Sequence, residues 1–242
     1  MHRDVNAQYN RANRGSITDR VSTHMRRKMY ARFIGCGVQA EDTILDVGVT
    51  SDQDQLASNY LEAWHPHGER ITACGIDDAS FLEQLYPGLK FVRGDGKCLP
   101  FRSGSFDWVH SSAVLEHVGS SVEQARFIAE LHRVCRKGVF ATTPNRWFPV
   151  EFHTVLPLVH WLPKRWFRTL LRALGHRELA LEEHLNLMGR SDLAKACTHA
   201  GLLDWRIDSV SLGGWPSNLL LLARKHGSGD QDATGDVAAH ER

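Results

Sequence analysis

The sequence of 242 residues contains no uncharged apolar run of about 18 residues or more, so we expect no membrane-spanning helix. It also lacks a strong charge of one sign. The formal net charge is +1, which gives no electrostatic basis for a nucleic-acid partner. The first residues, MHRDVNAQYNRANRG, lack the apolar core of a signal peptide. Together these absences predict a cytoplasmic protein.

Paired cysteines are missing as well. The five cysteines are odd in number and form no C-x-x-C pair; they are Cys36, Cys74, Cys98, Cys135 and Cys197. This scatter is typical of reduced thiols that serve as small core residues. Because no cysteine pair has the spacing of zinc ligands, we expect no metal site.

The sequence does contain a regular alternation of strand and helix patterns. Apolar segments typical of strands alternate with segments typical of helices, and they lie at 43–47, 70–76, 89–93, 106–111 and 139–142, with helices at 53–64, 80–86 and 122–134. This order indicates a parallel sheet covered on both faces. A helix at 189–200 and a hairpin of strands at 205–210 and 218–223 follow. The predicted fold class is therefore α/β: a Rossmann-like, doubly wound, mainly parallel seven-stranded sheet with an antiparallel C-terminal edge strand.

Changes in composition divide the chain further. Residues 1–40 form a polar segment, mobile over the first 20 residues, followed by an amphipathic helix at 22–38. The main domain spans 41–225, with an aromatic and basic insertion at about 146–188. The polar, Gly-rich tail at 226–242 is predicted to be disordered.

Polar or small residues follow each of the first four strands, and they include Asp46, Gly48, Asp77, Asp95, Gly96 and Ser111. In an open parallel sheet a ligand binds outside the carboxyl ends of the strands. Asp77 is placed to accept both ribose hydroxyls of a nucleotide-like ligand, and Asp95 to accept from an adenine amino group. Gly96 would let the base approach the backbone. Taken singly, each aspartate is equally well explained as a turn or helix-cap residue.

The run FVRGDGKCLPFRSGSFDWVHSSAVLEHV (91–118) resembles class I S-adenosylmethionine-dependent methyltransferases. It is most similar to their small-molecule and sugar-modifying branch. The similarity extends over 43–145, and more loosely over 189–225. The resemblance implies S-adenosylmethionine as cofactor, with Asp46 and Gly48 along its methionine part. It also implies Asp77 at the ribose, Asp95 at the adenine and Ser111 beneath the sulfonium.

The loop after the first strand departs from this family. Members have acid-x-Gly-x-Gly-x-Gly, whereas Asp46-Val-Gly48-Val-Thr50-Ser-Asp52 keeps only the first glycine. The cofactor has no pyrophosphate, so it does not need several glycines for a close phosphate approach. Thr50 would offer a hydroxyl to the carboxylate end of the cofactor. A non-catalytic module of this fold remains an alternative. An NAD(P)-dependent oxidoreductase is another, although its G-x-G-x-x-G pattern fails at two of three positions in GVTSDQ.

Two histidines are candidate general bases for methyl transfer to oxygen. Glu151 precedes His153 by two residues, and Glu183 immediately precedes His184, so a carboxylate is near each imidazole in the sequence. A surface or packing role is equally compatible with either histidine. His117 is interpreted as a packing residue.

The segment VLPLVHWLPKRWFRTLLRALGHR (155–177) mixes aromatic and aliphatic residues with five lysines or arginines. It is interpreted as a packed lid over the sheet, whose second half forms a basic amphipathic helix. Such a helix is typical of a contact with an anionic membrane, but also of an ordinary solvated face. The predicted function is methyl transfer to a small molecule or a glycan, free or lipid-linked, at oxygen.

Overall fold

A computed structural model describes residues 16–52, 56–151, 153–154 and 156–225. The predicted disordered tail (226–242) and residues 1–15 of the polar segment lie outside this described part. The structure contains a seven-stranded sheet with strand order β3-β2-β1-β4-β5-β7-β6. The predicted fold class is confirmed.

The strands are β1 (Ile44–Val47), β2 (Ile71–Gly75), β3 (Lys90–Arg93), β4 (Phe106–Ser112), β5 (Cys135–Pro144), β6 (Asp204–Leu212) and β7 (Trp215–Arg224). The first five are parallel to one another. The last strand, β7, pairs antiparallel with both β5 and β6, so β6 takes the edge position. Two consecutive glycines with positive φ, Gly213 and Gly214, turn the chain from β6 into β7.

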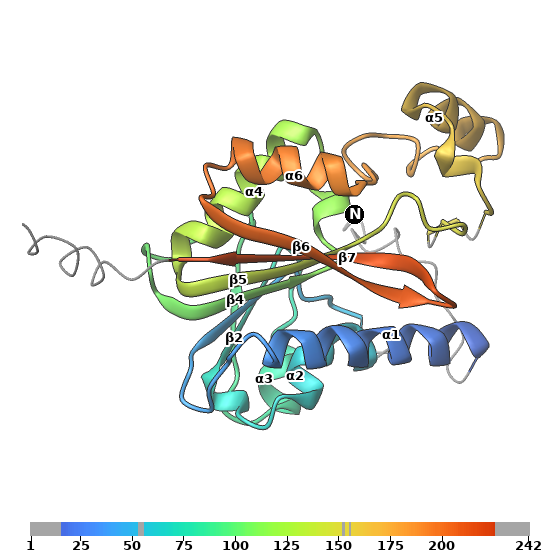
Figure 1. Cartoon of the computed structure of the whole chain (residues 1–242). Coiled ribbons are helices and arrows are strands. Elements are labelled where there is room, and N and C mark those ends of the chain that lie inside the picture. The colour runs from blue at the N-terminus through green and yellow to red at the C-terminus, as the bar shows by residue number, and fades with distance from the viewer. Residues whose placement is uncertain (1–15, 53–55, 152, 155, 226–242) are drawn as a thin grey trace, which may run out of the picture.

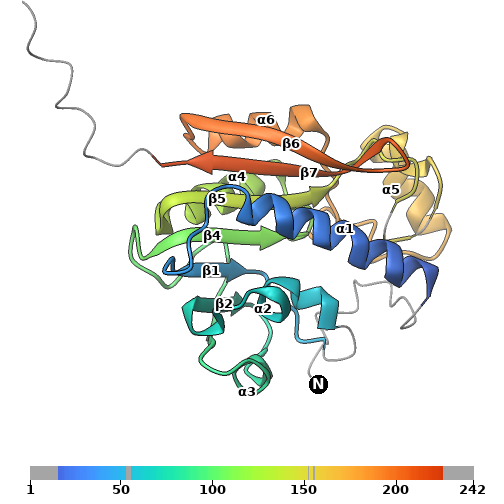
Figure 2. The same cartoon turned by 60° about the horizontal axis from the view of Figure 1, so that its bottom comes forward.

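Helices cover both faces of the sheet (Figures 1 and 2). On one face lie α1 (Ile17–Ile34), α2 (Tyr60–Trp64) and α3 (Phe81–Leu85), and on the other lie α4 (Ser121–Val134) and α6 (Arg190–His199). Short 3-10 turns occur at Leu56–Asn59, Gly68–Arg70, Leu115–His117 and Val159–Trp161. Each face has its own apolar core, because the strands of a doubly wound sheet are buried on both sides.

The first helix begins earlier than the sequence indicated. We expected residues 1–20 to be mobile, but α1 starts at Ile17 because Ser16 caps it, its hydroxyl accepting a hydrogen bond from the Asp19 N–H at 3.2 Å. The helix predicted at 53–64 is represented by the turn Leu56–Asn59 and α2; residues 53–55 lie outside the described part. The wrong expectation about 17–20 came from reading polar composition as disorder.

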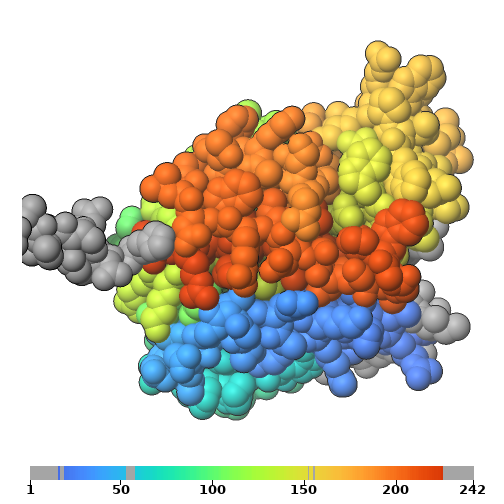
Figure 3. Space-filling view, viewed as in Figure 1, coloured from blue at the N-terminus to red at the C-terminus, as the bar shows by residue number. Residues whose placement is uncertain are grey.

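The insertion folds as a small unit around α5 (Lys164–Ala173). Its apolar core contains Phe167, Leu171, Ala180, Leu185 and Leu187, separate from the two cores of the sheet. Figure 2 shows this unit beyond the carboxyl ends of the parallel strands, and in Figure 3 it forms a projecting corner. None of the described helices combines the length and apolarity needed to cross a membrane.

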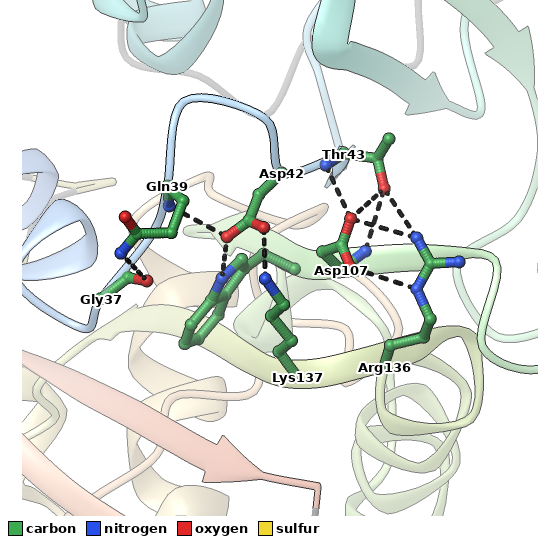
Figure 4. Close-up of polar contacts among 8 residues, drawn as sticks. Gly37, Gln39, Asp42, Thr43, Asp107, Arg136 and Lys137 are labelled. Carbon is green, nitrogen blue, oxygen red and sulfur yellow. Dashed lines mark hydrogen bonds and ion pairs between the residues drawn. The ribbon is translucent and has the colours of Figure 1, made fainter. Parts of the chain in front are cut away.

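Charged side chains join the amino ends of β1, β4 and β5 (Figure 4). Asp107 accepts hydrogen bonds from the Thr43 hydroxyl at 2.8 Å and from Arg136 at 3.1 Å. The buried Asp42 accepts from the Trp108 indole at 3.0 Å and is paired with a lysine of β5. Burial tends to raise the pKa of Asp107, but the hydrogen bonds from Arg136 and Thr43 hold it at about 2.

This network predicts an acid-sensitive contribution to stability. Asp107→Asn should lower the free energy of unfolding by about 1 kcal/mol or more at pH 7, because hydrogen bonds to a charged carboxylate are lost. A depressed pKa stabilises the folded state above the unfolded value, 3.8, so the difference from wild type should disappear as the pH falls through about 2. Urea unfolding followed by circular dichroism at several pH values measures it.

Asp208→Asn, in an exposed ion pair of β6, is the matched control and should change stability little. If the Asp107→Asn difference persisted unchanged at the lowest pH, the ionised carboxylate would not be its source.

Candidate functional site

The loop after β1 packs very closely against the segment that follows β4. Gly48 has a φ of +97°, and a β-carbon there would lie 2.2 Å from Val114 Cγ2. Any other residue would be strained by this backbone conformation and would collide with Val114. The glycine expected from the sequence is therefore required, and the neighbour that requires it is Val114.

Hydrogen bonds hold the rest of this loop, where the expected second and third glycines are missing. The Thr50 N–H donates to Asn59 Oδ1, and the Asn59 amide donates back to the Thr50 carbonyl, both at 2.9 Å. Thr50 Oγ1 accepts from the Asp52 N–H at 3.1 Å. Through these hydrogen bonds Thr50 shapes the loop.

Asp46 belongs to a buried polar group beneath the loop. Its carboxylate lies 2.8 Å from His110 Nδ1, and the other nitrogen of His110 lies 2.8 Å from the Tyr60 hydroxyl. Glu62, 2% exposed, is a further member of this group. Burial and the neighbouring Asp46 carboxylate raise the pKa of Glu62 well above its ordinary value. Nothing in the spacing of Glu62 or Tyr60 marks them in the sequence, whereas His110 is one of the polar residues at the end of β4.

Asp77 and Asp95 lie at the ends of β2 and β3, where the sequence predicted them. Within the described part of the chain, no hydrogen bond is formed by the Asp77 side chain. The next residue, Asp78, accepts from the Ser80 N–H at 2.9 Å and so takes the turn role weighed for Asp77. Asp95 is exposed and accepts from the Lys97 N–H at 2.9 Å. Both carboxylates retain oxygens that can accept from a ligand.

Gly96 and Ser111 have structural partners. A β-carbon at Gly96 would lie 2.2 Å from Phe127 Cε2 of α4, so the close packing of α4 requires this glycine. The Ser111 hydroxyl donates to the Val47 carbonyl at 2.8 Å and joins the carboxyl ends of β4 and β1. The roles expected for them at the adenine and the sulfonium remain predictions.

A cluster of imidazoles and carboxylates lies at the carboxyl ends of β4 and β5. His153 Nδ1 lies 2.6 Å from Glu151 Oε1, which is the carboxylate pairing expected from the sequence. His153 Nε2 lies 3.1 Å from His117 Nε2, and His117 Nδ1 donates to the His184 carbonyl at 2.7 Å. His117 is therefore part of the same cluster, a role that its interpretation as a packing residue omitted.

Burial and neighbouring charges shift the pKa values of this cluster. Burial tends to lower the pKa of His153, but the Glu151 carboxylate raises it above its ordinary value. The pKa of His117 is lowered to about 3 by burial and by His153. Burial raises the pKa of Glu116, which is fully buried, to about 7. The cluster thus contains groups whose protonation differs between neighbours, as in many functional sites.

His184, the second candidate base, contacts His117 through its backbone carbonyl. Its carbonyl accepts the hydrogen bond from His117, whereas its own Nε2 lies 3.6 Å from Glu178. The structure therefore favours His153 over His184 as a buried, oriented imidazole.

Comparison with known proteins assigns the central part of the chain. Residues 45–142 match a family described as a methyltransferase domain. This part of the chain is therefore similar to methyltransferase domains. No curated protein matches the sequence significantly.

Solved methyltransferases share the fold of this domain. One is an S-adenosylmethionine-dependent methyltransferase from Methanosarcina mazei, with 18% identity over 81% of this chain and 97% of that chain (TM-score 0.51). Another is magnesium protoporphyrin IX methyltransferase from Synechocystis, solved with S-adenosylhomocysteine, with 16% identity over 89% of each chain (TM-score 0.56). A third is phosphoethanolamine N-methyltransferase 2 from Haemonchus contortus with S-adenosylmethionine, with 13% identity over 76% of this chain and 38% of that chain (TM-score 0.52).

The family and the fold together support S-adenosylmethionine as the cofactor of this methyltransferase. The residues present fit it. The oxygens of Glu62 are buried and accept no hydrogen bond among the described residues, and Asp46 lies beside them. A cationic ligand group such as the cofactor's ammonium would compensate these carboxylates.

Asp77→Ala should weaken S-adenosylmethionine binding at least about tenfold, because a charged acceptor of ribose hydroxyls is removed. Calorimetric titration with S-adenosylmethionine and S-adenosylhomocysteine measures the effect. Asp78→Ala, one residue further on and engaged with Ser80, is the matched control and should bind almost normally. Equal affinities of wild type and Asp77→Ala would place the ribose elsewhere.

Proposed function

We propose that this methyltransferase transfers the methyl group of S-adenosylmethionine to an oxygen of a small molecule or a glycan. One observation carries the proposal: the imidazole of His153, 9% exposed, is held by a carboxylate at the carboxyl end of the sheet, next to the predicted cofactor site. The segment from Val114 to His117 connects the two places, because Val114 packs on Gly48 and His117 contacts His153. An oriented imidazole is the usual means of taking the proton of a hydroxyl.

The cofactor would be held by carboxylates at successive strand ends. Asp77 would accept from the ribose hydroxyls and Asp95 from the adenine amino group. Asp46 and Glu62 would face the ammonium of the methionine part, and Gly48 keeps the loop close to the segment after β4. S-adenosylmethionine supplies an activated methyl group, so the protein has chiefly to orient the acceptor.

Transfer is an in-line displacement. The methyl–sulfur bond breaks, a methyl–oxygen bond forms, and S-adenosylhomocysteine leaves. The hydroxyl proton of the acceptor passes to His153 Nε2, and Glu151 stabilises the imidazolium through Nδ1. His153 must first release any proton that it shares with His117 Nε2.

The surface of the insertion supports a lipid-linked acceptor as the more specific form of this proposal. Arg165 and Arg172 are exposed on α5, next to the exposed Trp166 and Leu174, at 59% and 50%. Two other cations of the segment are engaged within the protein, Lys164 with Asn186 and Arg168 with Glu182. The exposed arginines and apolar side chains together fit an anionic membrane surface.

Radiolabelled S-adenosylmethionine incubated with the protein and fractionated cell extract should yield a labelled product. Separation of the products into lipid and aqueous phases identifies the acceptor class. Label in either phase supports methyl transfer to a small molecule or glycan, and label in the lipid phase supports the lipid-linked form. Cofactor binding without labelling of any fraction would instead indicate the non-catalytic alternative. NADH binding without S-adenosylmethionine binding would indicate an oxidoreductase.

Membrane contact is tested by sedimentation with anionic vesicles. The double variant Arg165→Glu, Arg172→Glu should lose most vesicle binding at low salt, since each cation near an anionic surface contributes about 1 kcal/mol. The matched double variant Arg102→Glu, Arg206→Glu changes the net charge equally, at exposed positions outside the insertion, and should retain binding. An equal loss of vesicle binding in both double variants would show that binding depends on overall charge and not on the insertion.

A further inference from the structure

The two histidines of the cluster face one another through the same ring atom. His117 Nδ1 donates to the His184 carbonyl, and His153 Nδ1 lies 2.6 Å from Glu151 Oε1. With each Nδ1 engaged as a donor, the Nε2 lone pairs point toward a common space, where the two atoms are 3.1 Å apart. Two lone pairs in contact repel, so either one ring carries a proton on its Nε2 or a cation lies next to both nitrogens.

We propose that Glu116, His117 and His153 bind one divalent transition-metal cation. The two imidazole nitrogens and a carboxylate oxygen lie within 4.8 Å of one another. Two metal–nitrogen bonds of about 2.0–2.1 Å separate their nitrogens by roughly 2.9–3.4 Å, depending on the angle at the metal. The observed separation of 3.1 Å lies in this range.

The carboxylate of Glu116 supplies the independent observation. It is fully buried, and its Oε1 accepts no hydrogen bond within the described part of the chain. This oxygen lies 3.9 Å from His117 Nε2, so a small inward movement of the side chain brings it to a cation between the histidines. An unsatisfied buried carboxylate oxygen is costly, and coordination of a metal removes the cost.

Each of the three ligand side chains also forms a hydrogen bond through an atom that would not coordinate the metal. Glu116 Oε2 accepts from the Thr143 hydroxyl at 2.9 Å, His117 Nδ1 donates to a carbonyl, and His153 Nδ1 is held by Glu151. Glu151 is itself fixed by the N–H and the hydroxyl of Thr154, each at 2.6 Å. Outer partners of this kind orient metal-binding histidines and carboxylates.

The ligand set indicates the class of cation. Two imidazoles and one carboxylate suit Zn²⁺, Fe²⁺, Mn²⁺ or Co²⁺, whereas Ca²⁺ and Mg²⁺ prefer oxygen alone. Three protein ligands leave coordination positions for water or an acceptor oxygen. What the cation does there rests on the proposed function: it would acidify a coordinated hydroxyl and take over the proton removal assigned to His153 in the cation-free protein.

The absence of cysteine pairs in the sequence predicted no metal site. That expectation considered thiolate sites, and the present ligands are nitrogen and oxygen atoms. His117 and His153 are 36 positions apart in the sequence, and only the folding of the insertion over β4 brings them together.

Titration of the metal-free full-length protein with Co²⁺, followed by visible absorption, tests the site without S-adenosylmethionine. Wild type should bind one tight equivalent, and His153→Ala and Glu116→Gln should lose it. Glu151→Gln, which keeps all three ligands, should weaken binding by about 10–100-fold. Circular dichroism melting confirms that each variant is folded, and Glu116→Gln preserves side-chain shape if His153→Ala does not fold.

The chain has 14 histidines, so His199→Ala, an exposed histidine of α6, is the matched control and should keep the tight equivalent. Absence of a tight equivalent in wild type would overturn the proposal, as would its retention in both Glu116→Gln and His153→Ala. Cation binding without methyl transfer would leave the metal site standing and remove the proposed function. Methyl transfer without cation binding would support the proposed function and overturn the metal site.

Discussion

The contact between Gly48 and Val114 fixes the distance between the two working parts of this protein. At this point the loop after β1 and the segment after β4 lie so close that no β-carbon fits between them. The first carries the predicted contacts to the cofactor, and the second continues directly into Glu116 and His117. A displacement of either segment therefore changes the position of the acceptor end relative to the methyl group. In-line transfer tolerates little such displacement, because its rate depends on alignment.

The two ends of the sheet are built differently. At the amino ends, Asp42 and Asp107 are neutralised by cations and surrounded by donors, so their charges stabilise the fold (Figure 4). At the carboxyl ends, the oxygens of Glu62 and one oxygen of Glu116 are buried without donors among the described residues. Unsatisfied buried groups are uncommon in stable proteins, and they concentrate where a ligand completes them. Two carboxyl groups that lack donors among the described residues, Glu62 and Glu116, thus lie at the end where the cofactor and the acceptor are expected.

Much of the sheet was predictable from the sequence, because a strand buried on both faces must be apolar throughout. The prediction for β1 at 43–47 is one residue longer than the strand. The predicted start of β5 near 139 was wrong, because the strand begins at Cys135. Arg136 and Lys137 are exposed within the strand and paired with aspartates, so this part of the strand is not apolar. The aspartates at strand ends were found because strand order places them together. Glu62 and the pairing of His117 with His153 were not found, because both depend on packing between segments distant in the sequence.

The insertion contains a core of its own, in which Phe167 and Leu171 pack on Ala180, Leu185 and Leu187. It is joined to the segment after β4 by hydrogen bonds of Asn186, whose backbone donates to the Glu116 carbonyl at 2.7 Å and whose side chain donates to the Gly119 carbonyl at 2.8 Å. It also contacts the sheet through Trp161, which packs on Trp215 of β7. Because the apolar core of the insertion is separate from the two cores of the sheet, changes at Phe167 or Leu171 should leave those two cores in place. The unit that would contact the acceptor therefore gains its stability separately from the strands that would hold the methyl donor.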